Sequence, residues 1–192
     1  MRLIRNHGES MVYKNLDNDD RIKTALGYNF RLAELLAAVG YAQTKKIEKI
    51  NLIRKKNYEI LKKGLKSFNF IEFQKITNDP DEFYPYHIGL TFDEKTFGFN
   101  RDVFVDAVIA EGLPLTKGIP RTLDTNLIFE NNEKLPNAQK MNNETYIGIV
   151  TVGFPNGKKE MNKIVETFDK VNKNKNELQS ISSKKNKYKV YR

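Results

Sequence analysis

The feature that most constrains the fold is a long helical stretch, residues 32–66, in which two helical patterns follow each other. In the first pattern, leucine and valine recur at helical spacing, at Leu32, Leu35, Leu36 and Val39. Alanine and glycine fill many of the positions between them, and such small residues let another backbone approach closely. This half of the stretch therefore predicts a helix that packs tightly against a neighbouring element.

The second pattern carries an apolar stripe on one face and many lysines on the other. The side chains expected to face inward are Ile47, Ile50, Ile53 or Arg54, Tyr58, Leu61 and Leu65. Gly64 supplies the glycine signal that commonly ends a helix. We predict two helices, separated by a bend near Thr44.

After residue 67 the pattern changes to short strands and helices. Strands are predicted over 68–73, over 86–92 with Tyr86, Ile88, Leu90 and Phe92 on one face, and over 146–152. Helices are predicted over 101–111 with Asn100 as N-cap, over 157–171, and briefly from Pro136. The expected apolar stripe of the 101–111 helix is Val103, Phe104, Val108 and Ile109. This order predicts an α+β fold, in which a long helix pair leads into a small, mostly antiparallel sheet covered by helices.

The chain divides into four expected regions. Residues 1–31 are polar and irregular and are expected to form an extended strap lying on something else. Residues 32–66 are the connecting helices, and residues 67–171 form the C-terminal α+β domain. Residues 172–192 are a basic tail, expected to be disordered because it lacks apolar residues to bury.

Composition excludes several kinds of site. The chain has no cysteine, so it has no disulfide, no thiolate zinc site and no cysteine nucleophile, and this fits a cytoplasmic location. Its two histidines do not have metal-binding spacing, so no metal site is expected. No apolar run is long enough to span a bilayer, so no membrane partner is expected.

The net charge of +9 is unevenly distributed along the chain. Residues 173–192 contain seven basic residues and one acid and so carry +6 of that total. A solvated tail explains this charge better than nucleic-acid binding does. A non-catalytic basic module that binds nucleic acid or a partner protein stays open as an alternative function.

An ordered set of short motifs resembles one enzyme family. These motifs are Arg5-Asn6-His7-Gly8, Gly27-Tyr28-Asn29-Phe30-Arg31-Leu32, Glu34-Leu35, Ala37-Ala38-Val39-Gly40, Gln43, Tyr86-His87, Arg101-Asp102, Glu111-Gly112-Leu113-Pro114 and Leu135-Pro136-Asn137-Ala138. The set resembles the C-terminal portion of the DegT/DnrJ/EryC1/StrS sugar aminotransferases, over roughly residues 1–171. The resemblance implies the small domain of a type I aminotransferase fold, with residues 1–31 belonging to a missing large domain.

The family resemblance also implies a cofactor, substrates and an assembly. Such enzymes use pyridoxal phosphate to move an amino group from an amino acid, here expected to be glutamate, to a keto-sugar nucleotide, and they act as homodimers. Their cofactor-bonding lysine precedes the segment where this chain begins, and Lys14 and Lys23 lie on the wrong side of His7-Gly8. We therefore expect no catalytic residue in this chain and no activity from it alone. A dehydratase of the same family, with histidine in place of the lysine, is an alternative.

Four residues are carried over as binding candidates. Asn29 matches an asparagine that reaches the partner subunit's cofactor phosphate, although it also suits a helix cap. Arg31 is expected to meet an interface acid or a nucleotide-sugar diphosphate, or else to be exposed. His87 matches a position near the sugar-nucleotide pocket, and the alternative is a hydrogen-bonded strand histidine. His7 either serves the active site or lies at the surface. Lys117 and Arg121 flank a loop that is suited to a phosphate but is more typical of a solvated loop.

Overall fold

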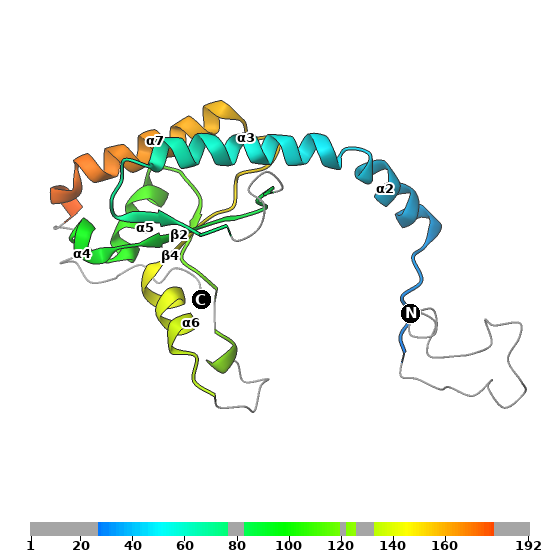
Figure 1. The fold of residues 1–192 in the computed structure, drawn as a ribbon, viewed down its shortest axis with the longest axis horizontal. Coiled ribbons are helices and arrows are strands. Elements are labelled where there is room, and N and C mark those ends of the chain that lie inside the picture. The colour runs from blue at the N-terminus through cyan, green and yellow to red at the C-terminus, as the bar shows by residue number, and fades with distance from the viewer. Residues whose placement is uncertain (1–26, 77–82, 120–121, 126–132, 179–192) are drawn as a thin grey trace, which may run out of the picture. The chain divides into compact units, whose positions relative to one another are not determined.

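A computed structural model describes residues 27–76, 83–119, 122–125 and 133–178 (Figure 1). The chain separates into two compact units, Met1–Ile47 and Glu48–Arg192, and each is described by itself. The candidate His7 and the lysines Lys14 and Lys23 lie outside the described residues.

In the N-terminal unit, the described residues form one helix, α2, Glu34–Thr44. No residue of α2 is buried, and Ala33 occupies the N-cap position without a side-chain cap. Large apolar side chains in and before this helix are exposed: Tyr28, Phe30, Leu32, Leu35, Leu36, Val39 and Tyr41, a set that we call the α2 apolar surface. The break before the next helix, α3, falls at Lys45 and Lys46, next to Thr44 as predicted.

In the C-terminal unit, the described residues form a four-stranded sheet in the order β1-β2-β4-β3. The strands are β1 (Ile71–Phe73), β2 (Ile88–Phe92), β3 (Leu115–Thr116) and β4 (Tyr146–Ile149). Each neighbouring pair is antiparallel, as expected, and Ile88 of β2 is the partner of Ile149 of β4. All three predicted strands are shorter in the structure, because residues 68–70, 86–87 and 150–152 lie outside the sheet.

Helices cover the apolar face of this sheet. The long helices α3 (Ile47–Leu65) and α7 (Lys158–Lys173) run side by side over it (Figure 1). A β-carbon at Gly64 would overlap Val165, so the glycine permits this close approach. Helix α5 (Arg101–Ala110) packs on the same core through Phe104, whose ring lies 5.1 Å from that of Phe168, centroid to centroid.

Aromatic rings fill the core beneath the helices. Phe92 and Phe97, the latter from the short helix α4 (Glu94–Phe97), are almost fully buried together with Phe104. Neighbouring rings meet edge-on or tilted, with centroids about 5 Å apart, which is a favourable aromatic geometry. The alternation of apolar residues in β2 and β4 therefore has the expected result, with Ile88, Leu90, Phe92, Ile147 and Ile149 all buried.

Some predicted inward positions are wrong. Ile47 is 52% exposed because it is the first residue of α3, and the buried polar residue on that face is Asn57. Ile109 is 43% exposed, whereas Val105 is fully buried, so α5 is rotated from the predicted stripe toward Val105. Tyr86 is 77% exposed because it precedes the first residue of β2 and has no strand beside it.

Short helical segments complete the unit. Helix α6 (Pro136–Lys140) starts on its proline, as predicted, and continues directly into a π-helix, η5 (Met141–Thr145). A 3₁₀ turn, η4, spans Leu123–Thr125. At the C-terminal end, the 3₁₀ turn η6 (Lys175–Leu178) buries Leu178, so packed structure extends beyond residue 171. Among the described helices, none has both the length and the apolar character needed to cross a membrane.

Candidate functional site

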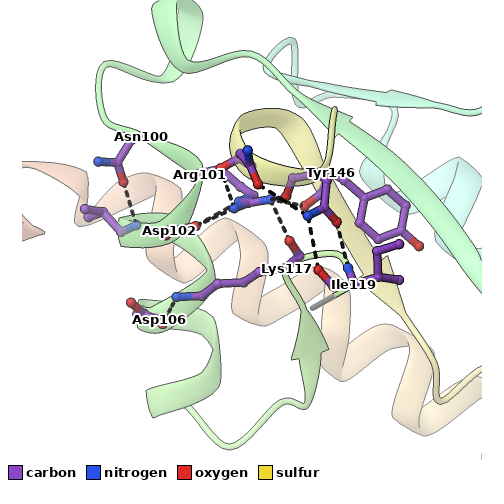
Figure 2. A network of polar contacts seen from close by, with 10 residues as sticks. Asn100, Arg101, Asp102, Asp106, Lys117, Ile119 and Tyr146 are labelled. Carbon is purple, nitrogen blue, oxygen red and sulfur yellow. Dashed lines mark hydrogen bonds and ion pairs between the residues drawn. The ribbon is translucent and has the colours of Figure 1, made fainter. Parts of the chain in front are cut away.

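The most extensive polar network centres on Arg101, the first residue of α5 (Figure 2). This side chain is 4% exposed. Its guanidinium donates to the backbone carbonyls of Lys117 (2.7 Å), Asn142 (2.8 Å), Tyr146 (3.1 Å) and Asn143 (2.7 Å), and lies 2.8 Å from the Asp102 carboxylate. Because its donors are occupied by the protein itself, Arg101 joins α5, η5 and the end of β3 rather than binding a ligand.

The same network holds in place the loop that begins at Lys117, which the sequence suggested as a candidate phosphate site. The Asn142 side chain accepts from the Ile119 amide (2.7 Å) and donates to the Ile119 carbonyl (3.1 Å) (Figure 2). Gly118, which directly precedes Ile119, has a φ of +115°, and this left-handed backbone conformation favours glycine. Lys117 forms an ion pair with Asp106 at 2.5 Å, and Arg121 lies outside the described residues. The lysine of this loop is therefore already neutralised within the protein.

A second polar group lies on the sheet face opposite the aromatic core. The Tyr146 hydroxyl and His87 Nε2 are 2.8 Å apart. Gly148 lies beneath them, and a β-carbon at this position would overlap both His87 and the Thr116 side chain. The Thr116 hydroxyl is buried and makes no hydrogen bond with a described residue. His87, Tyr146 and Thr116 thus form a polar cluster across three strand ends, with one donor left unused.

Burial sets the protonation of this cluster. Desolvation lowers the pKa of His87 below its ordinary value and raises the pKa of Tyr146 above its own. Both groups are therefore uncharged at neutral pH, and the tautomer of His87 decides which of them donates. A neutral pair of this kind suits hydroxyl groups of a ligand rather than a charged one.

The other carried-over residues lie in the N-terminal unit. Asn29 does not cap α2, since Ala33 holds that position. Instead, the Asn29 Oδ1 accepts hydrogen bonds from the Arg31 backbone amide (3.4 Å) and Nε (3.1 Å). Both side chains are exposed, and the Asn29 amide nitrogen makes no hydrogen bond with a described residue. The arrangement leaves this nitrogen free to donate.

The structure brings some predicted site residues together and adds others. Asn29 contacts Arg31, while His87 contacts Tyr146 and lies over Gly148. Tyr146 and Thr116 were not among the site residues predicted from the sequence. The alternation along 146–149 held a signal for Tyr146, because it lies on the opposite face from Ile147. Within the described residues, no group of three acidic or histidine side chains is placed to hold a metal ion.

Comparison with known proteins gives a consistent result. The sequence model of the DegT/DnrJ/EryC1/StrS aminotransferase family matches residues 1–166. A search of curated proteins found no match.

Solved structures resemble the chain in fold. An aminotransferase from Psychrobacter cryohalolentis is 18% identical with a TM-score of 0.74, covering 90% of this chain and 48% of its own. DesI, solved in the presence of its TDP-sugar product, is 16% identical with a TM-score of 0.72, covering 95% of this chain and 44% of its own. The putative sugar aminotransferase Spr1654 from Streptococcus pneumoniae, in its PMP form, is 15% identical with a TM-score of 0.70, over the same shares. The chain thus spans less than half the length of these aminotransferases.

Proposed function

Since the chain belongs to the DegT/DnrJ/EryC1/StrS aminotransferase family, we propose that it forms the C-terminal part of a pyridoxal-phosphate-dependent nucleotide-sugar aminotransferase. The complete enzyme moves an amino group from an amino acid, taken here to be glutamate, to a keto-sugar nucleotide. The observation that carries this proposal is the family match over residues 1–166, in a chain that spans less than half the length of the solved aminotransferases that share its fold.

The residues of this chain fit a supporting role toward the cofactor. When bound, pyridoxal phosphate supplies the electron sink that amino-group transfer requires. Asn29 offers an exposed amide nitrogen to the cofactor phosphate, and Arg31 holds the other end of that amide through Oδ1. Arg31 thereby orients the donor. The lysine that bonds the cofactor is proposed to come from the large domain.

The polar cluster is proposed as the part of the chain that meets the sugar. His87 and Tyr146 are uncharged at neutral pH, and the Thr116 hydroxyl has no hydrogen-bond partner in the part of the chain that the structure describes. Neutral donors and acceptors of this kind pair with sugar hydroxyls without the desolvation cost of a charge. His87 is therefore assigned to substrate binding, as the resemblance implies.

The α2 apolar surface is proposed to pack against the large domain and the partner subunit of a homodimer. Its residues carry apolar side chains that are 53–77% exposed in this chain. Apolar patches of this kind commonly mark interaction sites. Asn29 and Arg31, immediately before α2, would then lie at the subunit interface, where a side chain from one protomer reaches the cofactor of the other.

The proposal is tested by supplying the chain with a polypeptide that carries the lysine-bearing first half of a family aminotransferase. Amino transfer is assayed from glutamate to a panel of UDP- and TDP-linked keto-sugars. We expect activity from the mixture and none from the chain alone. If the two polypeptides associate but the mixture aminates none of the sugars, the aminotransferase proposal is wrong.

The role of Asn29 is tested by measuring how much coenzyme stays bound after gel filtration. We expect Asn29→Ala in the mixture to bind pyridoxal phosphate about tenfold more weakly, the loss of one hydrogen bond to a charged group. Asn69→Ala, which removes an exposed asparagine elsewhere, should leave retention unchanged. Retention of the coenzyme by the chain alone, at one defined lysine, would contradict the proposed division of labour.

A further inference from the structure

A different region of the C-terminal unit contains an arginine, Arg54, whose buried Nε has no hydrogen-bond partner among the described residues. Arg54 lies on α3, one turn before the buried Asn57 and on the same helix face. Asn57 donates through Nδ2 to the carbonyls of Val152 (2.8 Å) and Asn156 (2.9 Å). These two bonds tie the 152–156 loop to α3, so the loop is held beside Arg54.

The loop is also braced internally. The Asn156 amide donates to the Gly153 carbonyl (3.1 Å), and the Asn156 side chain donates to the Thr151 carbonyl (2.9 Å). Gly153 lies against the arginine, because a β-carbon there would stand 3.5 Å from Arg54 Nε. Arg54 therefore faces a fixed backbone rather than a mobile one.

The guanidinium of Arg54 is partly desolvated, and its charge is not paired with an acid within the described ranges. Its Nε is buried without a hydrogen bond, and the side chain makes no ion pair with any described residue. The contact on its other side is the ring of Tyr86, whose centroid lies 5.6 Å from the guanidinium carbon. An arginine cannot lose its charge, so burying one of its N–H groups without an acceptor is costly. This cost points to an acceptor that binds from outside.

We propose that Arg54 is the centre of an anion-binding site, bounded by Tyr86 and the Gly153 backbone, that takes the carboxylate or phosphate group of a small molecule. Nε and one terminal nitrogen form the fork that pairs with two oxygens of such a group. Tyr86 is 77% exposed and can turn aside to open that edge. Phe154, the next residue of the loop, is 74% exposed and offers apolar surface to the body of the ligand.

The site is separate from the polar cluster. Tyr86 and His87 are adjacent in the chain, and their recorded contacts differ: Tyr86 meets Arg54, and His87 meets Tyr146. Because Ile88 pairs with Ile149, Tyr86 and the residues after β4 leave the sheet at the same end. The proposal does not depend on the aminotransferase function.

The test follows the Arg54 Nε–H signal of the full chain by nitrogen-15 NMR. Inorganic phosphate and benzoate serve as probes for the two anion types. We expect the Nε–H signal to shift saturably with at least one probe, and Arg54→Gln to weaken binding of that probe about tenfold or more. Lys49→Gln removes the same charge from an exposed position on α3 and should bind as the wild type does.

The variant Arg54→Lys separates geometry from charge. It keeps the positive charge but loses the fork, so its affinity should fall close to that of Arg54→Gln. The proposal is overturned if neither probe shifts the wild-type Nε–H signal. It is also overturned if Arg54→Gln and Lys49→Gln lose affinity equally, since that result indicates general charge attraction.

Discussion

The two units of the chain use similar helical patterns in opposite ways. Helix α3 buries Tyr58, Leu61 and Leu65 in a core that this chain supplies itself. Helix α2 repeats leucine and valine at the same spacing and buries nothing. The difference teaches that an amphipathic pattern specifies which face of a helix is to be buried. Which element packs on that face depends on the folded and assembled protein.

The largest test of this contrast is a pair of leucine truncations. Leu61→Ala should lower the free energy of unfolding by about 3 kcal/mol, because it opens a cavity at a fully buried position. Leu35→Ala, at a position 77% exposed, should change it by less than about 0.5 kcal/mol. Urea unfolding of the full chain measures both. Equal losses would show that α2 is buried in solution.

Two side-chain amides, one on α3 and one on α2, test the same contrast between the two helices. Asn57→Ala should cost about 2 kcal/mol of unfolding free energy, because two loop carbonyls lose their donor in a buried setting. Gln43→Ala, on exposed α2, removes a side-chain amide of similar chemistry and should be nearly neutral. Thermal melting resolves the difference. A neutral Asn57→Ala would mean that water replaces the lost donor.

The α2 apolar surface should be visible as self-association. We expect the full chain to form oligomers in sedimentation velocity and to bind apolar dyes. Leu35→Asp should weaken that association about tenfold, since it places a charge in the apolar contact. The matched control is Leu52→Asp, which makes the same substitution at an exposed leucine on α3. A monomeric wild-type chain with low dye affinity would contradict this expectation.

The smallest expected effect concerns pH. Burial lowers the pKa of His87, so the unfolded chain takes up a proton at a higher pH than the folded chain does. The contribution of His87 to stability is therefore complete above the unfolded pKa of about 6.5 and is lost as pH falls through the lower folded value. His87→Gln should flatten the dependence of the urea midpoint on pH between about pH 7.5 and about pH 5.

A matched variant identifies the cause of that shift. Tyr146→Phe removes the hydroxyl at 2.8 Å from His87 Nε2 but keeps the ring that meets His87 edge-on. Because burial is the cause, the pKa of His87 measured by NMR titration should stay below its ordinary value in Tyr146→Phe. A return to the ordinary value would assign the shift to the hydrogen bond instead.

The sequence by itself determined the order and kind of the main elements, although the predicted elements did not include helix α4 or strand β3. The helix break near Thr44, the Asn100 cap, the helix start at Pro136 and the antiparallel sheet follow from signals that act over a few residues. The family was also readable, because its motifs lie in a fixed order along the chain. Local steric and hydrogen-bonding preferences suffice for such features.

Tertiary structure decided which side chains meet. The rotation of α5 toward Val105, the exposure of Tyr86 and the burial of Asn57 depend on what lies opposite each residue. The Arg101 network gathers carbonyls up to 45 positions away, and His87 meets Tyr146 across 59. No periodic pattern carries such information, because packing and hydrogen bonding between distant segments depend on the folded backbone that brings them within a few ångströms.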